Sequence, residues 1–240
     1  MTSEVVIDRR FRGPPASANG GYTCGIAAGA MGARAAEVNL RLPPPLERPL
    51  ALEATQEEVR ILDGQNVVAD GQRLDGVELE LPEAPPIHLA EEADARYPFY
   101  DDHSFPDCFV CGPAREPGDG LRIYPGPIEG AQIMACAWEP DPGLTGEDGA
   151  VRGEIVWSAL DCPSGLAAGH YATDEVTMVL ARLRGEVDRR LEPAQPYIVV
   201  GWALEVDDRK HRAGTAIFDR GGKPCAWADA LWIELREDRG

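Results

Sequence analysis

The second half of the chain contains the run Val151-Arg152-Gly153-Glu154-Ile155-Val156-Trp157-Ser158-Ala159-Leu160-Asp161-Cys162. A similar run lies near the start, Ala18-Asn19-Gly20-Gly21-Tyr22-Thr23-Cys24-Gly25-Ile26-Ala27-Ala28-Gly29-Ala30. Each run starts at a glycine and continues with small and apolar residues, which indicates a helix enclosed by other elements. When Asn19 is aligned with Arg152, an offset of 133 residues, Ala28 falls on Asp161. The chain therefore reads as a duplicated unit in which only the second helix carries an aspartate.

Segments with strand character follow each predicted helix. The alternation of polar and apolar residues over 37–42 and 77–81 is typical of half-buried strands. The predicted helices are 20–34 and 153–170, and the predicted strands are 37–42, 50–62, 67–69, 77–81, 121–124, 131–138, 178–183, 197–206, 213–218 and 225–235. A helix followed by an antiparallel meander buries its apolar side against one face of the sheet. Two such units side by side form one continuous sheet with two central helices, an α+β fold.

The division into units follows composition. Residues 85–106 are rich in Pro, Glu, Asp and Ala, and X-Pro pairs there favour extended backbone. We predict an N-terminal unit over 1–84, a linker over 85–106 and a C-terminal unit over 107–240. The aromatic residues of the linker indicate that it packs on the rest of the protein.

The charge of the chain excludes several classes of partner. The 240 residues include 23 Lys and Arg against 41 Asp and Glu, a formal net charge of −18. Binding to nucleic acid or to an anionic membrane surface needs clustered cations, so neither is predicted for this acidic protein. No apolar run approaches the ~20 residues of a membrane span, and the N-terminus lacks an export pattern. We therefore expect a cytoplasmic protein.

The six cysteines are expected to be reduced and mostly to act as small buried hydrophobic residues. Cys108 and Cys111 form a C-x-x-C pair close to His103, which is also compatible with a metal knuckle or a redox pair. A structural zinc site usually needs four ligands, and here only Cys162 or Cys136 could complete one, through a tertiary contact. Structural packing is the preferred interpretation, so we predict no metal site and no cofactor.

Two segments resemble a known family. The run Asp107-Cys108-Phe109-Val110-Cys111-Gly112-Pro113, continuing to Gly120-Leu121-Arg122-Ile123, is similar to the Cys-Phe-x-Cys-Gly…Gly-Leu segment that precedes the hotdog unit in PaaI-like thioesterases. The run from Gly153 to Asp161 resembles the glycine-started helix of that group. The duplication resembles the tandem, or double-hotdog, acyl-CoA thioesterases. The resemblance implies two tandem hotdog units, each a curved antiparallel sheet wrapped around a helix, forming an intrachain pseudo-dimer.

The resemblance also implies an active site between the units. Thioester hydrolysis needs a base or nucleophile and donors for the developing oxyanion. Asp161 is the candidate base or nucleophile, and Asn19, Gly20 and Gly21 at the start of the facing helix are the candidate donors. The reciprocal site would pair Ala28 with Gly153 and lacks a base, so at most one site per chain is expected to be competent.

Three residues depart from the family pattern. Arg152 stands where many members have His, and Glu154 replaces a second glycine. Pro163 lies two residues after Asp161 and cannot donate an intrahelical hydrogen bond. Either the helix kinks there, or a helix begins there with Asp161 near its N-cap.

The candidate substrate is acyl-CoA or another acyl thioester. Arg209, Lys210 and Arg212 form the densest basic cluster and are candidate phosphate ligands, with Glu154 a further candidate in substrate binding. A second basic group, Arg9-Arg10-Arg12, is an alternative. The leading hypothesis is an acyl-CoA thioesterase-like hydrolase. The alternatives are a non-catalytic acyl or small-ligand binding protein, or a structural module. Association of two tandem chains into a homodimer is a further expectation.

Overall fold

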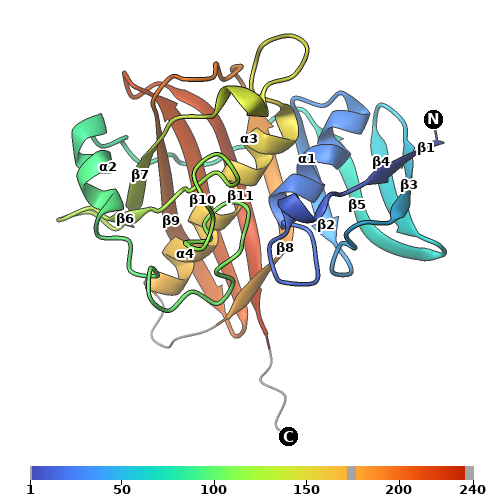
Figure 1. Ribbon diagram of the computed structural model, residues 1–240, viewed down its shortest axis with the longest axis horizontal. Helices are drawn as coiled ribbons and strands as arrows, with labels where there is room; N and C mark the ends of the chain where they lie inside the picture. The colour runs from blue at the N-terminus through green and yellow to red at the C-terminus, as the bar shows by residue number, and fades with distance from the viewer. Residues whose placement is uncertain (1, 172–176, 236–240) are drawn as a thin grey trace, which may run out of the picture.

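A computed structural model describes residues 2–171 and 177–235 (Figure 1). The helices are α1 (Gly20–Met31), α2 (Ile87–Asp94), α3 (Gly153–Ala159) and α4 (Cys162–His170), with short 3-10 turns at Arg9–Phe11 and Pro142–Leu144. The strands are β1 (Thr2–Val6), β2 (Ala35–Leu40), β3 (Pro49–Ala54), β4 (Glu58–Asp63), β5 (Asn66–Leu74), β6 (Gly126–Pro127), β7 (Met134–Trp138), β8 (Met178–Val187), β9 (Tyr197–Asp207), β10 (Lys210–Asp219) and β11 (Pro224–Glu234).

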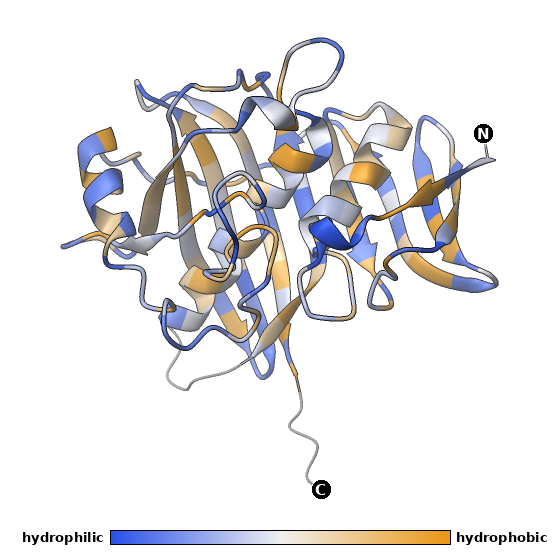
Figure 2. Ribbon diagram, viewed as in Figure 1, coloured by the Kyte–Doolittle hydropathy of each residue, from blue (hydrophilic) through white to orange (hydrophobic). Residues whose placement is uncertain are grey.

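The strands form a single eleven-stranded sheet in the order β1-β3-β4-β5-β2-β8-β11-β10-β9-β7-β6. Every pairing is antiparallel, and the two halves of the chain meet where Val38 of β2 lies opposite Leu183 of β8. Helices α1, α3 and α4 all lie on one face of this sheet (Figure 1). Along the strands, polar and apolar residues alternate (Figure 2), as they must when one face is covered and the other faces water. The predicted α+β fold with one continuous sheet and central helices is confirmed.

Helix α1 begins at an N-cap that the sequence encodes locally. The Asn19 side chain accepts a hydrogen bond from the Tyr22 N–H at 2.9 Å, and the helix ends at Gly32, whose φ of 59° is left-handed. Glycines in the helix allow α3 to approach closely. A Cβ atom at Gly21 would lie 2.5 Å from the carbonyl oxygen of Trp157, and one at Gly25 would collide with the Cα of Glu154.

The second predicted helix is two helices. α3 ends at Ala159 and α4 begins at Cys162, with Asp161 as the N-cap of α4 at φ −79° and ψ −83°. Pro163, the second residue of α4, has no N–H to bond into the preceding turn. The sequence allowed either a kinked helix or a new helix that begins near Pro163, and the structure has the new helix. Asp161 therefore lies at the break between the two helices.

Several other sequence predictions also differ from the structure. The predicted strand 50–62 is two strands, β3 and β4, separated by residues 55–57. Residues 77–81 are not a strand, because the Val77 N–H donates to Glu186 Oε2 at 2.7 Å and the Val77 carbonyl accepts from Trp227 Nε1 at 2.9 Å, so side chains replace the ladder partners. Residues 121–124 form two hydrogen bonds with the 109–110 segment but no strand. The predicted linker contains helix α2.

Helix α2 was missed because its apolar residues are few and lie among acids. Ala90 is fully buried, and Ile87 is partly buried against the apolar cluster that Ala90 forms with Ala135 of β7 and Ile198 of β9. The segment 85–106 is therefore a packed crossing at the far edge of the sheet rather than a free tether. The assignment of unit boundaries at 84 and 107 stays a prediction.

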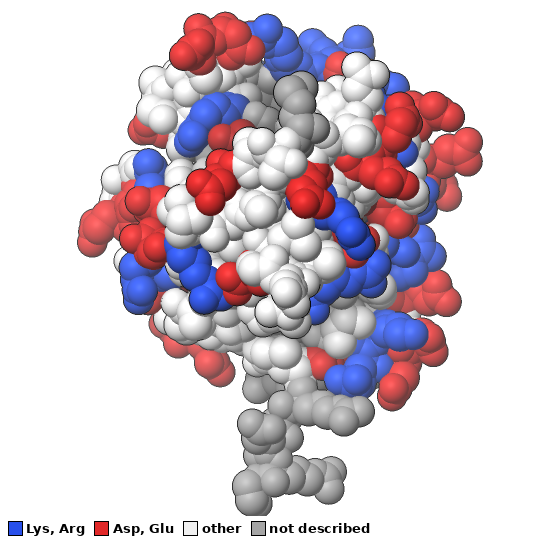
Figure 3. Space-filling model, turned by 90° about the vertical axis from the view of Figure 1, so that its right-hand side faces the viewer, with Lys and Arg blue, Asp and Glu red and all other residues white. Residues whose placement is uncertain are grey.

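Acidic and basic side chains are interspersed on the end of the molecule formed by the first half of the chain (Figure 3). Arg41 pairs with Asp70, and Arg48 pairs with Asp63. The excess of acid is thus partly neutralised by local pairs. None of the helices in the described part of the chain is long and apolar enough to cross a membrane.

Candidate functional site

The Asp161 carboxylate joins the second unit to the first helix. Its Oδ2 atom accepts one hydrogen bond from Asn19 Nδ2 and one from the Gly21 N–H, both at 2.8 Å. The residue is 2% exposed. Within residues 2–171 and 177–235, its other oxygen, Oδ1, is buried and has no hydrogen-bond partner. One carboxylate oxygen is therefore fixed and the other is available.

Asp161 is the N-cap of α4, but its side chain does not cap that helix. Asp161 makes no side-chain bond to the start of α4. Its carbonyl oxygen instead accepts from the Ser164 N–H at 3.2 Å and from Ser164 Oγ at 2.7 Å. Asn19 has two roles, since its Oδ1 caps α1 while its Nδ2 reaches Asp161. The amide oxygen accepts while the amide nitrogen donates, whereas an ionised aspartate at this N-cap would have no donor for Asp161.

Burial raises the pKa of Asp161 to about 7, and the hydrogen bonds from Gly21 and Asn19 oppose that effect. Desolvation disfavours the charged form of a carboxyl group, and donors favour it. The result is a carboxyl group that exchanges a proton near neutral pH.

A cavity of about 580 Å³ lies beside this carboxylate. Asn19, Gly20 and Asp161 line it, together with the mainly apolar residues Phe105, Leu166, Met178, Leu180 and Trp232. Both halves of the chain contribute walls. Its volume is in the range of small-molecule sites, and an apolar lining with a few polar groups is typical of them.

The structure brings the predicted catalytic residues together. Asn19, Gly20 and Asp161 line the same cavity, and Gly21 bonds directly to Asp161. Gly20 is the first residue of α1, where backbone N–H groups have no intrahelical partner. At the equivalent place in the other half, Ala28 is buried and offers no functional group.

The predicted substrate-binding residues lie elsewhere. Arg209 and Lys210 are at the β9–β10 turn, and Arg209 donates to the Glu234 carbonyl at 3.0 Å. Arg212 pairs with the buried Asp229 at 3.0 Å and with Glu205 at 3.3 Å. None of the three basic residues lines the cavity beside Asp161. Their role in phosphate binding stays a prediction.

Glu154 also lies away from that cavity, in the first turn of α3, where it pairs with Arg152 at 3.3 Å. Its predicted role in substrate binding likewise stays a prediction. Arg41, which the sequence analysis did not single out, lines the cavity. Its guanidinium is half exposed and bonds Asp70 at 2.5 and 3.0 Å. No pattern in the sequence selects Arg41, because this residue directly follows β2 and belongs to no recognisable motif.

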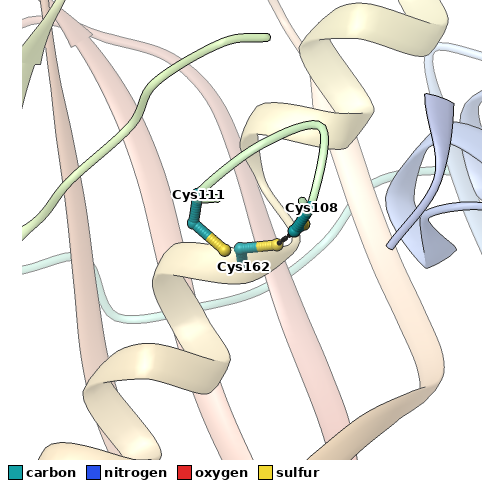
Figure 4. A group of neighbouring side chains, drawn as sticks. All are labelled: Cys108, Cys111 and Cys162. Atoms are coloured by element: carbon teal, nitrogen blue, oxygen red, sulfur yellow. Dashed lines mark hydrogen bonds between the residues drawn. The ribbon is translucent and has the colours of Figure 1, made fainter. Parts of the chain in front are cut away.

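Three cysteines converge at the same cavity. The sulfur atoms of Cys108, Cys111 and Cys162 all lie within 4.8 Å of one another (Figure 4). The sequence shows the C-x-x-C pair, but it left open whether Cys162 or Cys136 lies beside that pair in the folded protein. All six cysteines of the chain are free thiols.

Comparison with solved structures covers nearly the whole chain. The tesB protein of Mycobacterium avium subspecies paratuberculosis aligns over 98% of this chain and 93% of its own, with a TM-score of 0.65 and 11% identity. The acyl-CoA thioesterase II TesB2 of Mycobacterium marinum aligns over 99% and 94%, with a TM-score of 0.62 and 12% identity. A protein with a hot dog fold from Alicyclobacillus acidocaldarius aligns over 98% and 94%, with a TM-score of 0.60 and 12% identity.

The chain has the double-hotdog fold. The predicted tandem hotdog architecture is thereby confirmed over nearly the whole chain. No family model matches the sequence, and a search of curated proteins finds no match. At 11–12% identity, the likeness to these structures establishes the double-hotdog fold and not the reaction. What this double-hotdog chain does must be argued from its own site.

Proposed function

We propose that the chain hydrolyses acyl thioesters in the cavity beside Asp161. The observation that carries the proposal is the state of the Asp161 carboxylate: the start of α1 holds one oxygen, and the other has no hydrogen-bond partner among the described residues. It lines an apolar cavity that can accept an acyl chain. The fold is shared with proteins named as thioesterases, which supports the proposal without deciding it.

The proposed reaction uses Asp161 as a general base. Asp161 takes a proton from a water molecule as the water oxygen attacks the thioester carbonyl carbon. The Gly20 N–H, at the positive end of the α1 dipole, stabilises the negative charge that develops on the carbonyl oxygen. The carbon–sulfur bond then breaks, and the thiolate takes the proton back from Asp161. The products are a carboxylic acid and a free thiol.

We propose acyl-CoA as the substrate class because the cavity has a basic residue in its lining as well as apolar walls. Arg41 is half exposed and lines the cavity, and its guanidinium forms a two-point ion pair with Asp70. The phosphate of a carrier group outside the cavity would compete with Asp70 for this guanidinium. The predicted cytoplasmic location and homodimer stay predictions.

The test is hydrolysis of a panel of acyl-CoA substrates of increasing chain length, followed by chromatography of the free acid. We expect Asp161→Asn to lower kcat/KM by about a hundredfold or more, the range for loss of a general base. Asp63→Asn is the matched control, because Asp63 is a partly exposed carboxylate at a strand end, paired with Arg48. Unchanged hydrolysis in Asp161→Asn would refute the assignment.

The second candidate function is binding of an acyl ligand without turnover. One observation favours it. The Gly21 N–H, which was predicted to hold the oxyanion, is already engaged by Asp161. This alternative predicts that acyl ligands raise the melting temperature of the protein while no free acid forms from any substrate of the panel.

A further inference from the structure

The three cysteines at the cavity form a compact group contributed by two separate segments. Cys108 and Cys111 lie on the loop before β6, and Cys162 is the first residue of α4 (Figure 4). The Sγ atoms of Cys108 and Cys162 are 3.6 Å apart, and all three sulfur atoms lie within 4.8 Å of one another. The side chains are 3%, 3% and 7% exposed. The cluster is thus nearly sealed from bulk water.

The spacing of the sulfur atoms matches a metal better than a disulfide. With a zinc–sulfur distance of about 2.3 Å, two thiolates of a tetrahedral site lie about 3.8 Å apart. A disulfide needs about 2.05 Å between its sulfur atoms. The Cys108–Cys162 separation of 3.6 Å is close to the first value. The three sulfur atoms lie close enough together for one thiophilic cation to contact all of them.

The loop already holds Cys108 as a metal ligand needs to be held. The backbone N–H groups of Val110 and Cys111 both donate to the Cys108 sulfur, which fixes the position of that sulfur atom. Gly112 closes the turn, where a Cβ atom would lie 2.5 Å from the Cys108 nitrogen. Phe109 is fully buried and anchors the loop against α1, with its ring 6.3 Å from that of Tyr22.

Cys162 is equally well placed. It occupies the first position of α4, directly after the break that follows α3. Asn19 Nδ2, which bonds Asp161, also lies 3.7 Å from the Cys162 sulfur. A buried set of thiolates beside a carboxylate is costly unless a cation compensates for the charge.

We propose that Cys108, Cys111 and Cys162 bind one Zn²⁺ ion as thiolates. Among the described residues no fourth Cys, His, Asp or Glu belongs to the cluster, so the fourth position is filled from the cavity, which all three cysteines line. Zinc sites with three protein ligands and one open position are a known class. The ion ties the 105–112 loop to α4 one residue from Asp161. This proposal is independent of thioester hydrolysis.

The experiment uses the full chain, purified under reducing conditions, loaded with Zn²⁺ and passed through a desalting column. Elemental analysis is expected to find close to one zinc ion per chain. Cys111→Ser and Cys162→Ser are expected to lose most of it. Cys225→Ser, which removes a buried thiol outside the cluster, is the matched control and is expected to keep it.

A second measurement needs no variant. Co²⁺ added to the metal-free wild-type chain should give the intense thiolate-to-cobalt charge-transfer absorption of a site with several sulfur ligands. Three outcomes would overturn the proposal: no zinc retained and no charge-transfer band, equal zinc loss in Cys225→Ser and Cys111→Ser, or a Cys108–Cys162 disulfide in the zinc-loaded protein by mass spectrometry.

Discussion

The close approach of α1 to the second unit gives a sharp test of the structure. Gly21→Ala would place a Cβ atom 2.5 Å from the Cβ of Asp161 and 2.5 Å from the carbonyl oxygen of Trp157. Backbone atoms cannot move aside as a flexible side chain can. Gly29→Ala is the matched control in the same helix, because Gly29 is exposed and a Cβ atom there would have no neighbour within 4 Å.

The magnitudes follow from three terms. Helix propensity favours alanine over glycine by about 1 kcal/mol at either position. At Gly29 this term stands alone, so the free energy of unfolding should rise by about 0.5 to 1 kcal/mol. At Gly21 overpacking costs about 1 to 3 kcal/mol. Loss of the hydrogen bond to the buried Asp161 costs about 1.5 to 3 kcal/mol. The net change at Gly21 is a loss of about 2 to 5 kcal/mol.

The assay is equilibrium unfolding in urea, followed by far-ultraviolet circular dichroism and by tryptophan fluorescence. For a chain of this size each kcal/mol shifts the melting temperature by roughly 2 to 4 °C, so Gly21→Ala should also melt well below the wild type. If Gly21→Ala were as stable as Gly29→Ala, the helices would not be in contact at Gly21, and the hydrogen bond that positions Asp161 would not exist.

Three further predictions concern the site and the sheet. Asn19→Ser should keep the cap of α1 but lose the donor to Asp161. We expect the free energy of unfolding, measured by urea denaturation, to fall by about 1 to 2 kcal/mol, and kcat for thioester hydrolysis to fall as well. An unchanged kcat would contradict the positioning role of Asn19. Arg41→Ala should raise KM for acyl-CoA but not for a short uncharged thioester, and an equal rise for both would argue against phosphate recognition. Burial would raise the pKa of Asp219, but hydrogen bonds from Arg189 and two backbone N–H groups outweigh it and hold that pKa below its usual value. A lowered folded-state pKa stabilises the protein above the unfolded pKa of about 4, and that stability is lost as pH falls through the folded pKa. Asp219→Asn should therefore destabilise the protein at neutral pH and much less in acid; urea melts showing the same difference at both pH values would contradict this.

The helix starts were predictable because they are local. Alignment of Asn19 with Arg152 places both residues at N-caps, that of α1 and that of α3. The break before α4 was one of two predicted alternatives, because Pro163 has no N–H to donate to the preceding helical turn. Alternation of polar and apolar residues predicted most strands for the same reason, as it depends only on neighbours in sequence.

Helix α2 and residues 77–81 were mispredicted where the partners are distant. The backbone of Val77 bonds to the side chains of Glu186 and Trp227, which are more than 100 residues away in the sequence. The alternating residues 77–81 therefore do not pair with another strand. The acidic residues of α2 concealed a narrow apolar side that packs mainly against β7.

The sequence by itself determined the units of this protein: two glycine-started helices, each with a meander, and an aspartate in only one of them. The tertiary structure decided what those units meet. It joined Asp161 to Asn19 across 142 residues and Cys162 to Cys108 across 54. The physical reason is that caps, breaks and alternation depend on neighbouring residues, whereas the convergence of side chains at a cavity depends on how the sheet closes around the helices and on where the 105–112 loop packs.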